Sequence, residues 1–499
     1  MPVGNAVQHS QGLRERGYSM ATGGFFNIVT GGAAAQNSRF GQYVDTSRNH
    51  IVMCGQLGDI NGTNLGESQV WYRIDDAWKF QGRLTNSDST SAERQAGITI
   101  TELVTGGSAG AAYAAVGHPY SNHSGLSNAG AVSVHEKSSL TGSWTQVATL
   151  TDPVIGGDGT SDTMTLSGMS LVGDTLAVTH EKADLNELGI AGTSNRGRVN
   201  IFVREGHTGA GEAGPVWSSQ QILAGSGSNE FFGRNVALNK TNNDLLAVAG
   251  LTLSTDTSST QGYVKVFQRS GTTWTAKATI KASDAATADV FGTGVSNGRK
   301  ALSFCGDTIV AGASGQDHDV DGNNSVSNAG MAYVFRALTG NYSQWTEVAR
   351  LTGPNRVSND RVGDAVTHWQ SGDQLRIAVG AYGSDLNGDD ANDLTSSGTF
   401  TDDGAVLIFQ NTRDNIFECV SIIKRQGASD GVTITSGRGS NTYRQMFSMG
   451  SMSMNDEGTL VVGAMNDPSD TDGVTQTAIN NGSVSFYHMD WGVHIGEFQ

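Results

Sequence analysis

The chain has 499 residues, of which 37% are hydrophobic and 16% charged, with 67 glycines and 6 prolines. Its formal net charge of −17 makes nucleic acid and anionic lipid poor partners, and no apolar run is long enough to insert into a membrane as a helix. Its three cysteines, Cys54, Cys305 and Cys419, lie too far apart for a disulfide framework or a zinc-binding pattern.

Residues 1–39 precede the repeated part of the chain and lack the apolar core of a conventional signal peptide. They contain the apolar segment "FFNIV" at 25–29, for which two interpretations stay open. This segment is either a strand that pairs with the last repeat and latches a ring, or an arm that docks on a neighbouring molecule. We favour docking, because the last repeat has its own candidate fourth strand, "WGVHIGEF" at 491–498.

One unit of four short segments recurs from residue 40 to the end of the chain. The first segment carries Phe-Gly, as in "FGQYV" (40–44), "FGRNV" (232–236) and "FGTGV" (291–295). The second is apolar and ends at Gly-Ala, as in "DTIVAGA" (307–313) and "GTLVVGA" (458–464). Both segments are short and rich in β-branched residues, which predicts strands.

The third and fourth segments reveal the number of copies. The third follows the pattern Gly-x-Val-x-Val-Phe, with its central position at Val70, Val132, Val199, Val264, Ala332, Val406 and Val484. These positions recur about every 60–80 residues, as expected of a structural repeat. The fourth begins with tryptophan at Trp78, Trp144, Trp217, Trp274, Trp345 and Trp491, and with Phe417 in the sixth copy. The sequence therefore holds seven copies of one unit.

Four strands per unit, without a helical period between copies, predict an all-β fold: a seven-bladed β-propeller of four-stranded antiparallel blades over 40–499. The blades are expected at about 40–94, 95–162, 163–228, 229–286, 287–358, 359–440 and 441–499. Two β-sandwiches are the alternative, but they do not explain copies in one register. We expect the tryptophans to anchor blade packing, and Cys54 and Cys305 to be buried thiols.

The motifs Phe291-Gly292 and Gly312-Ala313 resemble those of the FG-GAP repeat family, which includes the head propeller of integrin α-chains. The resemblance covers roughly residues 40–499 and is best in the fifth copy. It implies a β-propeller with adhesion or extracellular interaction roles. Integrin propellers place a calcium loop before the Val-Gly-Ala strand, where this chain has a tight turn or an irregular loop. Here the acidic loop follows that strand.

Two of these acidic loops have carboxylates or amides at alternate positions. The fifth copy places Asp317, Asp319 and Asp321 before a glycine; the sixth copy supplies Asp385, Asn387, Asp389 and Asp393. Calcium prefers six to eight oxygen ligands, and alternate side chains on a curling loop can converge on one ion. The spacing predicts calcium sites that rigidify the loops. The alternative is that these residues only form turns, which Asp, Asn and Gly favour in any long loop.

No catalytic motif appears in its required context, so we expect a non-enzymatic binding or adhesion module that contacts protein or glycan partners through its loops. We expect it outside the cell or on a particle surface, without nucleic-acid partners or membrane insertion. The first alternative is a structural component of a virion, an appendage or another large assembly, with residues 1–39 contacting a partner. The second is an enzyme that uses the central channel.

Overall fold

The computed structural model describes residues 24–30, 40–55, 66–85, 97–102, 111–153, 168–205, 216–295, 300–384, 404–424, 451–464 and 483–488, apart from short gaps within these ranges, together with positions 95 and 164. No helix in this part of the chain is long and apolar enough to cross a membrane. All 28 described elements are β-strands. The strands form seven four-stranded antiparallel sheets.

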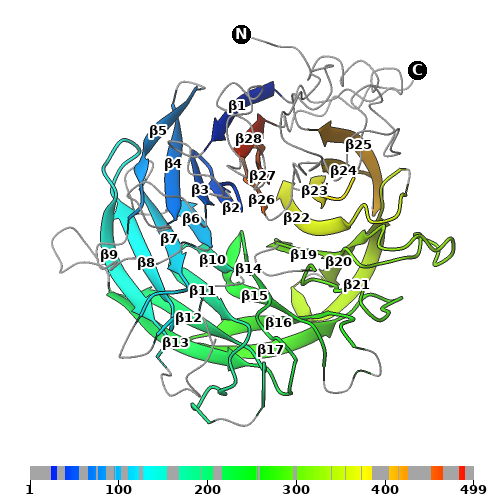
Figure 1. The fold of residues 1–499 in the computed structure, drawn as a ribbon, viewed down its shortest axis with the longest axis horizontal. Helices are drawn as coiled ribbons and strands as arrows, with labels where there is room; N and C mark the ends of the chain where they lie inside the picture. Colours follow the sequence, from blue (N-terminus) through cyan, green and yellow to red (C-terminus); the bar gives the residue numbers. More distant parts are fainter. Residues whose placement is uncertain are drawn as a thin grey trace, which may run out of the picture.

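In each sheet the strands follow one another from the centre of the molecule outwards (Figure 1). The first strands are β2 (Tyr43–Ser47), β6 (Ile98–Glu102), β10 (Met169–Val172), β14 (Asn235–Asn239), β18 (Leu302–Cys305), β22 (Val362–Ser371) and β26 (Met452–Met454). The second strands are β3 (His50–Gly55), β7 (Ala112–His118), β11 (Thr175–His180), β15 (Asn242–Gly250), β19 (Thr308–Ala313), β23 (Gln374–Ala381) and β27 (Thr459–Ala464).

The outer half of each sheet has the same order. The third strands are β4 (Glu67–Ile74), β8 (Ala131–Lys137), β12 (Arg198–Glu205), β16 (Tyr263–Ser270), β20 (Met331–Leu338), β24 (Ala405–Arg413) and β28 (Ser483–His488). The outermost strands are β5 (Ala77–Arg83), β9 (Thr145–Thr151), β13 (Val216–Ala224), β17 (Thr273–Ile280), β21 (Asn341–Leu351), β25 (Ile416–Lys424) and, in the last sheet, β1 (Gly24–Thr30).

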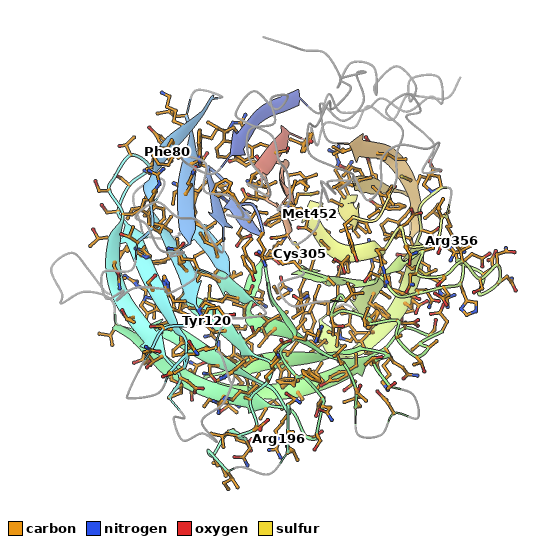
Figure 2. All side chains as sticks on the ribbon, viewed as in Figure 1. Phe80, Tyr120, Arg196, Cys305, Arg356 and Met452 are labelled. Atoms are coloured by element: carbon orange, nitrogen blue, oxygen red, sulfur yellow. The ribbon has the colours of Figure 1, made fainter. Side chains whose placement is uncertain are left out.

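The sheets are arranged radially around a common centre, as in a β-propeller (Figure 1). Each first strand contacts the first strand of the next sheet, and β26 contacts β2, so the ring is closed. Figure 2 places Cys305 and Met452 near the centre, while Arg196 and Arg356 lie at the periphery. The prediction of an all-β propeller with four-stranded antiparallel blades is confirmed.

The N-terminal strand β1 completes the last sheet. It pairs antiparallel with β28, from Gly24 opposite His488 to Thr30 opposite Ser483. Residues 24–30 are therefore a ring latch, and the docking interpretation that we favoured is wrong for this segment. The predicted fourth strand at 491–498 lies outside the described residues, and β1 takes its place beside β28. The chain closes the ring with its first strand because both ends of the repeat array would otherwise leave strand edges unpaired.

Hydrophobic clusters of described residues fill the spaces between neighbouring sheets. The cluster between the last and the first sheet contains Phe40, Val44 and Phe486. The predicted role of the tryptophans is confirmed wherever the structure describes them: Trp217 packs against Tyr113 of the preceding sheet, and Trp78 packs against Phe486. Trp491 lies outside the described residues. Cys305 is buried, as expected, whereas the Cys54 side chain is not described.

Hydroxyl groups link the inner edges of neighbouring first strands. Main-chain N–H groups on these edges have no further strand to pair with, so they need other acceptors. His368 N donates to Ser303 Oγ of the preceding sheet at 3.2 Å, and Met454 N donates to Thr367 Oγ1 at 3.1 Å. Further bonds of this kind join Leu171 to Thr99, Leu238 to Ser170 and Val44 to Ser451, and Asp45 accepts from Ile100 N.

Candidate functional site

The loops that follow the second strands form the candidate functional site. Since neighbouring strands are antiparallel, these loops lie on the same face of the ring as the connections that lead into the first strands. We call this the loop face. The two best described examples are the third-sheet loop, residues 181–197, and the fifth-sheet loop, residues 314–330. The fifth-sheet loop contains the predicted ligands Asp317, Asp319 and Asp321.

Both loops contain the same capped turn. In the fifth-sheet loop, Asp319 Oδ1 accepts from the main-chain N of Asp321 at 3.1 Å and of Asn323 at 2.8 Å. In the third-sheet loop, Asn186 Oδ1 accepts from Leu188 N at 3.0 Å and from Ile190 N at 2.9 Å. The Asn186 amide oxygen and the Asp319 carboxylate oxygen thus each accept two main-chain N–H groups of their own turn. Asn and Asp side chains commonly stabilise turns in this way.

The first aspartate of each loop also has a shared role. Asp317 Oδ1 accepts from Asn328 N at 2.7 Å, and Asp184 Oδ1 accepts from Asn195 N at 2.6 Å. These bonds tie the start of each loop to the residues that lead into the third strand. Asp317 and Asp319, like Asp184 and Asn186, therefore have a structural role, because each of these four side chains accepts from the main chain of its own loop.

Two of the three predicted calcium ligands of the fifth-sheet loop, Asp317 and Asp319, already accept hydrogen bonds from the loop itself. The main-chain N–H of Asn323 is the largest cause that keeps the pKa of the Asp319 carboxyl below its usual range, followed by the Asn324 amide at 2.6 Å. Within the described part of the chain, no group of three or more His, Cys, Asp or Glu side chains could hold a metal ion. Asp385, Asn387, Asp389 and Asp393 of the sixth copy lie outside the described residues. Calcium binding stays a prediction for both loops.

A second repeated device joins each loop to the next sheet. The Asn328 side chain donates to Asn359 Oδ1 at 3.1 Å, and Arg361 N donates to the Asn328 carbonyl at 3.1 Å. The same pair of bonds connects Asn195 to Asn229 at 3.0 Å and to Phe231 N at 3.0 Å. We call this pair of bonds the asparagine clasp. It fixes each loop relative to the neighbouring sheet, so the loops do not move independently.

Both partners of each clasp have left-handed backbones, with φ between 50° and 69° at Asn195, Asn229, Asn328 and Asn359. Asparagine tolerates this conformation better than most residues. Sequence reasoning missed the clasp. The signal that reveals it is Ser-Asn-x-Gly before a third strand, followed in the next copy by Asn-Asp or Asn-Glu before the first strand, as at Asn328-Ala329-Gly330 and Asn359-Asp360.

An acidic residue caps the same connection, three positions before the glycine of Phe-Gly or, in the sixth copy, of Val362-Gly363. Asp289 Oδ2 accepts from Ala286 N at 2.7 Å, and Asp360 Oδ2 accepts from Val357 N at 2.8 Å. Glu230 Oε2 accepts from Gly227 N at 2.8 Å in the fourth sheet. All three side chains are buried. Burial raises the pKa of the Asp289 carboxyl to about 6.

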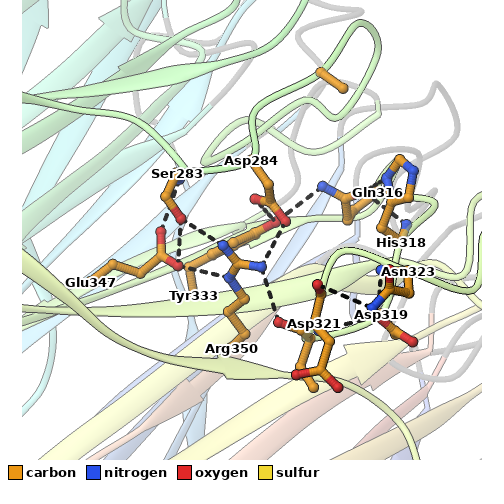
Figure 3. Close-up of polar contacts among 12 residues, drawn as sticks. Ser283, Asp284, Gln316, His318, Asp319, Asp321, Asn323, Tyr333, Glu347 and Arg350 are labelled. Carbon is orange, nitrogen blue, oxygen red and sulfur yellow. Dashed lines mark hydrogen bonds and ion pairs between the residues drawn. The ribbon is translucent and has the colours of Figure 1, made fainter.

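Arg350 on β21 connects the fifth-sheet loop to its neighbours (Figure 3). Its guanidinium donates to Glu347 Oε1 at 2.8 Å, to Ser283 Oγ at 2.6 Å and to the Val320 carbonyl at 3.0 Å, and it pairs with Asp284 at 3.1 Å. Each of the three guanidinium nitrogens has an acceptor, so Arg350 is a clamp on the loop.

A buried hydroxyl extends this network into the sheet. Tyr333 on β20 donates to Asp284 Oδ1 at 2.8 Å and accepts from Gln316 Nε2 at 3.1 Å (Figure 3). Burial is the largest cause that raises the pKa of the Tyr333 phenol above its usual range. Arg356, ahead of β22, donates to the carbonyls of Asp317 at 2.6 Å and Asn324 at 2.8 Å. The loop is therefore held from both sides.

The Phe291-Gly292 and Gly312-Ala313 motifs of the fifth copy contact each other in the structure. Gly292 N donates to the Gly312 carbonyl at 2.7 Å, which joins the connection ahead of the first strand, β18, to the end of the second strand, β19. A family model described as FG-GAP repeat matches residues 274–335, which contain both motifs and end in β20. The chain is a β-propeller with an FG-GAP repeat at residues 274–335.

Two solved structures that resemble this propeller share little sequence with it. One is the periplasmic gluconolactonase PpgL of Pseudomonas aeruginosa, 12% identical, with a TM-score of 0.44 over 77% of this chain and 85% of that one. Another is the α-L-arabinofuranosidase Arb93A from Fusarium graminearum in complex with an iminosugar inhibitor, 10% identical, with a TM-score of 0.36 over 72% of this chain and 93% of that one. No curated protein matches the chain.

Proposed function

We propose that the chain is a seven-bladed propeller that acts as a non-enzymatic binding or adhesion module and contacts protein or glycan partners through its loop face. The observation that supports this most directly is the construction of the third-sheet and fifth-sheet loops. Both are held by capped turns and asparagine clasps, which lowers the entropy lost when a partner binds.

These rigid turns present apolar side chains to solvent. Leu188 is 75% exposed and Ile190 is 59% exposed on the third-sheet turn, and Val320 is 42% exposed on the fifth-sheet turn. Exposed apolar residues on a fixed turn favour interaction with a partner, because little conformational entropy is lost when the partner buries them. The net charge of −17 favours partners that are neutral or basic. We expect the module to work outside the cell or on a particle surface.

A binding experiment tests this function. Labelled protein is applied to intact cells and to a glycan array, alongside the double variant Leu188→Ser/Ile190→Ser. The loop variant should bind at least about tenfold more weakly, which corresponds to about 1.4 kcal/mol. Val216→Ser is the matched control, since Val216 is 60% exposed on the outermost strand of the same sheet. Equal binding by all three proteins would exclude the third-sheet loop, and no binding by the parent protein would count against the function.

The assembly role loses part of its support, because residues 24–30 pair within the chain's own ring. An enzyme in the central channel is opposed by the lysine side chains that cross the ring interior, described in the next subsection.

We also propose structural calcium in the sixth-copy loop, with Asp385, Asn387, Asp389 and Asp393 as ligands. Calcium should raise the melting temperature of the parent protein, and a chelator should reverse the rise. In the variant Asp385→Ala/Asp389→Ala the rise should disappear. Asp319→Asn is the matched control, because Asn186 already caps the equivalent turn with an amide. Should Asp319→Asn alone remove the rise, the ion belongs to the fifth-sheet loop instead.

A further inference from the structure

Lys240 crosses the interior of the ring. It directly follows β14 of the fourth sheet, and its main-chain N donates to the Phe304 carbonyl of the fifth sheet at 3.1 Å. Its side chain reaches the sixth and seventh sheets and passes the Trp369 ring, with Nζ 5.8 Å from the ring centroid. One residue therefore connects four sheets at the turn end of the first strands.

The Lys240 ammonium is fully coordinated. Nζ donates to the His368 carbonyl at 2.8 Å, to the Met454 carbonyl at 3.0 Å and to Thr367 Oγ1 at 3.1 Å. An ammonium has three N–H donors, and all three have an acceptor here. The two carbonyls belong to the inner edges of β22 and β26, where no further strand can pair with them. Burial lowers the pKa of the Lys240 ammonium to about 8.

The same two edges use hydroxyls for their N–H groups. His368 N donates to Ser303 Oγ, and Met454 N donates to Thr367 Oγ1. The donors of these edges are thus satisfied from the preceding sheet, and the carbonyls are left to face the interior of the ring. Two carbonyls and a hydroxyl that converge on one point form an oxygen cradle of the kind that coordinates monovalent cations and ammonium groups.

We propose that His368 O, Met454 O and Thr367 Oγ1 form a monovalent-cation site, and that the Lys240 ammonium is its built-in occupant. We call it the carbonyl cradle. Lys300 contributes a second crossing, since its Nζ donates to the Val44 carbonyl of β2 at 2.9 Å and lies 3.7 Å from Asp45. The two lysines join the fourth and fifth sheets to the sixth, seventh and first sheets, and they occupy the interior that a substrate would have to enter.

Chemical rescue tests the carbonyl cradle. In Lys240→Ala the cradle has no tethered cation, so the melting temperature should fall by several degrees. Methylammonium chloride supplies N–H donors of the right charge and should restore most of the loss. Tetramethylammonium chloride at equal ionic strength has no N–H and should not restore it. Potassium chloride tests whether a bare cation is also accepted, and rescue by either methylammonium or potassium supports the site.

Two variants serve as controls. Lys240→Met keeps the apolar stem without the charge, so it should also be less stable than the parent protein. Methylammonium should raise its melting temperature less than that of Lys240→Ala, because the methionine side chain fills the space in which methylammonium would bind. Lys277→Ala removes an exposed lysine of β17 and should match the parent protein in every salt. If Lys240→Ala does not fold, its refolding yield in methylammonium is compared with that in tetramethylammonium. Parent-like stability of Lys240→Ala, or an equal response to all salts, would overturn the proposal.

Discussion

At the scale of single residues, glycine is required where one sheet touches the next. Gly330 ends the fifth-sheet loop with a φ of 80°, and a Cβ there would collide with the main chain at Val362 of the sixth sheet. Gly197 and Gly262 occupy the same place against Phe232 and Phe291. The conformation and the close approach act together, which explains why glycine precedes the third strand in these copies.

Replacing Gly330 by alanine should lower the free energy of unfolding by at least about 2 kcal/mol, since strain and a main-chain collision add. Gly322→Ala is the control in the same loop. Gly322 has a φ of 76° but nothing within 4 Å of an added Cβ, so its cost should be only about 1 kcal/mol. Urea denaturation measures both. Equal costs would mean that the contact with Val362 does not matter.

Buried histidines make the second sheet sensitive to acid. His118 Nε2 lies 2.9 Å from Ser133 Oγ, and His135 Nε2 lies 3.0 Å from the same oxygen. Both rings are buried, so His118 is not an exposed residue of the loop face. Burial lowers the pKa of His118 to about 3 and that of His135 to about 4. The serine hydroxyl donates to one neutral ring and accepts from the other.

These pKa values predict the direction of the pH dependence. The folded-state pKa values lie below the ordinary histidine value of 6.5, so between about pH 6.5 and 4 the unfolded chain binds protons that the folded chain does not. The free energy of unfolding should therefore fall as the pH falls through this window, by up to about 1.4 kcal/mol per pH unit for each histidine. His135→Gln should make the slope shallower in urea titrations at several pH values. An unchanged slope would remove His135 as a source.

At the scale of strands, hydroxyl groups set the register between neighbouring sheets. Ser303 of β18 accepts from His368 of β22, and Ser170 of β10 accepts from Leu238 of β14. Between the fourth and fifth sheets the corresponding residue is Ala237, which has no hydroxyl. At that interface the Lys240 N–H bonds to the Phe304 carbonyl instead. The interfaces are thus similar in geometry and unequal in hydrogen bonding.

Ser303→Ala should cost about 1 kcal/mol of unfolding free energy, because it leaves the buried His368 N–H without its acceptor. Ala237→Ser is the reverse change, and its hydroxyl should accept from the Phe304 N–H and raise stability by up to about 1 kcal/mol. Thermal denaturation of both variants should show a lower melting temperature for Ser303→Ala and a higher one for Ala237→Ser. A stabilising Ser303→Ala or a destabilising Ala237→Ser would show that packing outweighs these bonds.

At the scale of the whole molecule, the ring is closed in two places between the last and first sheets. On the outside β1 pairs with β28, and on the inside Ser451 and Ser453 bond to Val44 and Asp45. Closure matters because each sheet buries its apolar faces only against its neighbours. An open ring would expose the cluster of Phe40, Val44 and Phe486.

Deletion of residues 1–39 removes β1 and should lower the melting temperature markedly or abolish cooperative unfolding, since β28 then becomes an unpaired edge. Deletion of residues 1–23 retains β1 and should leave the melting temperature close to that of the parent protein. Circular dichroism and size-exclusion chromatography follow both proteins. A stable, monomeric 40–499 fragment would show that the inner contacts alone close the ring.

The sequence was sufficient to predict four antiparallel strands in each sheet and the packing role of tryptophans such as Trp217, but it did not predict that β1 is the outermost strand of the last sheet. These features depend on local alternation of apolar residues and on repetition, and both can be read along the chain. The spacing of Asp317, Asp319 and Asp321 predicted calcium, but spacing does not tell whether a carboxylate accepts from its own loop or from an ion.

Only the tertiary structure decided which segments far apart in sequence meet. It placed residues 24–30 beside β28, joined Asn328 to Asn359 and brought Lys240 to Met454. The pairing of residues 24–30 with β28 and the contact of Lys240 with Met454 leave no periodic signal, because each occurs once. The asparagine clasp does recur, but its two asparagines belong to different copies, so neither copy alone shows the contact. The repeated sequence specifies the structure of one blade. Whether the last blade meets the first depends on the packing angles between all the blades, which no single repeat contains.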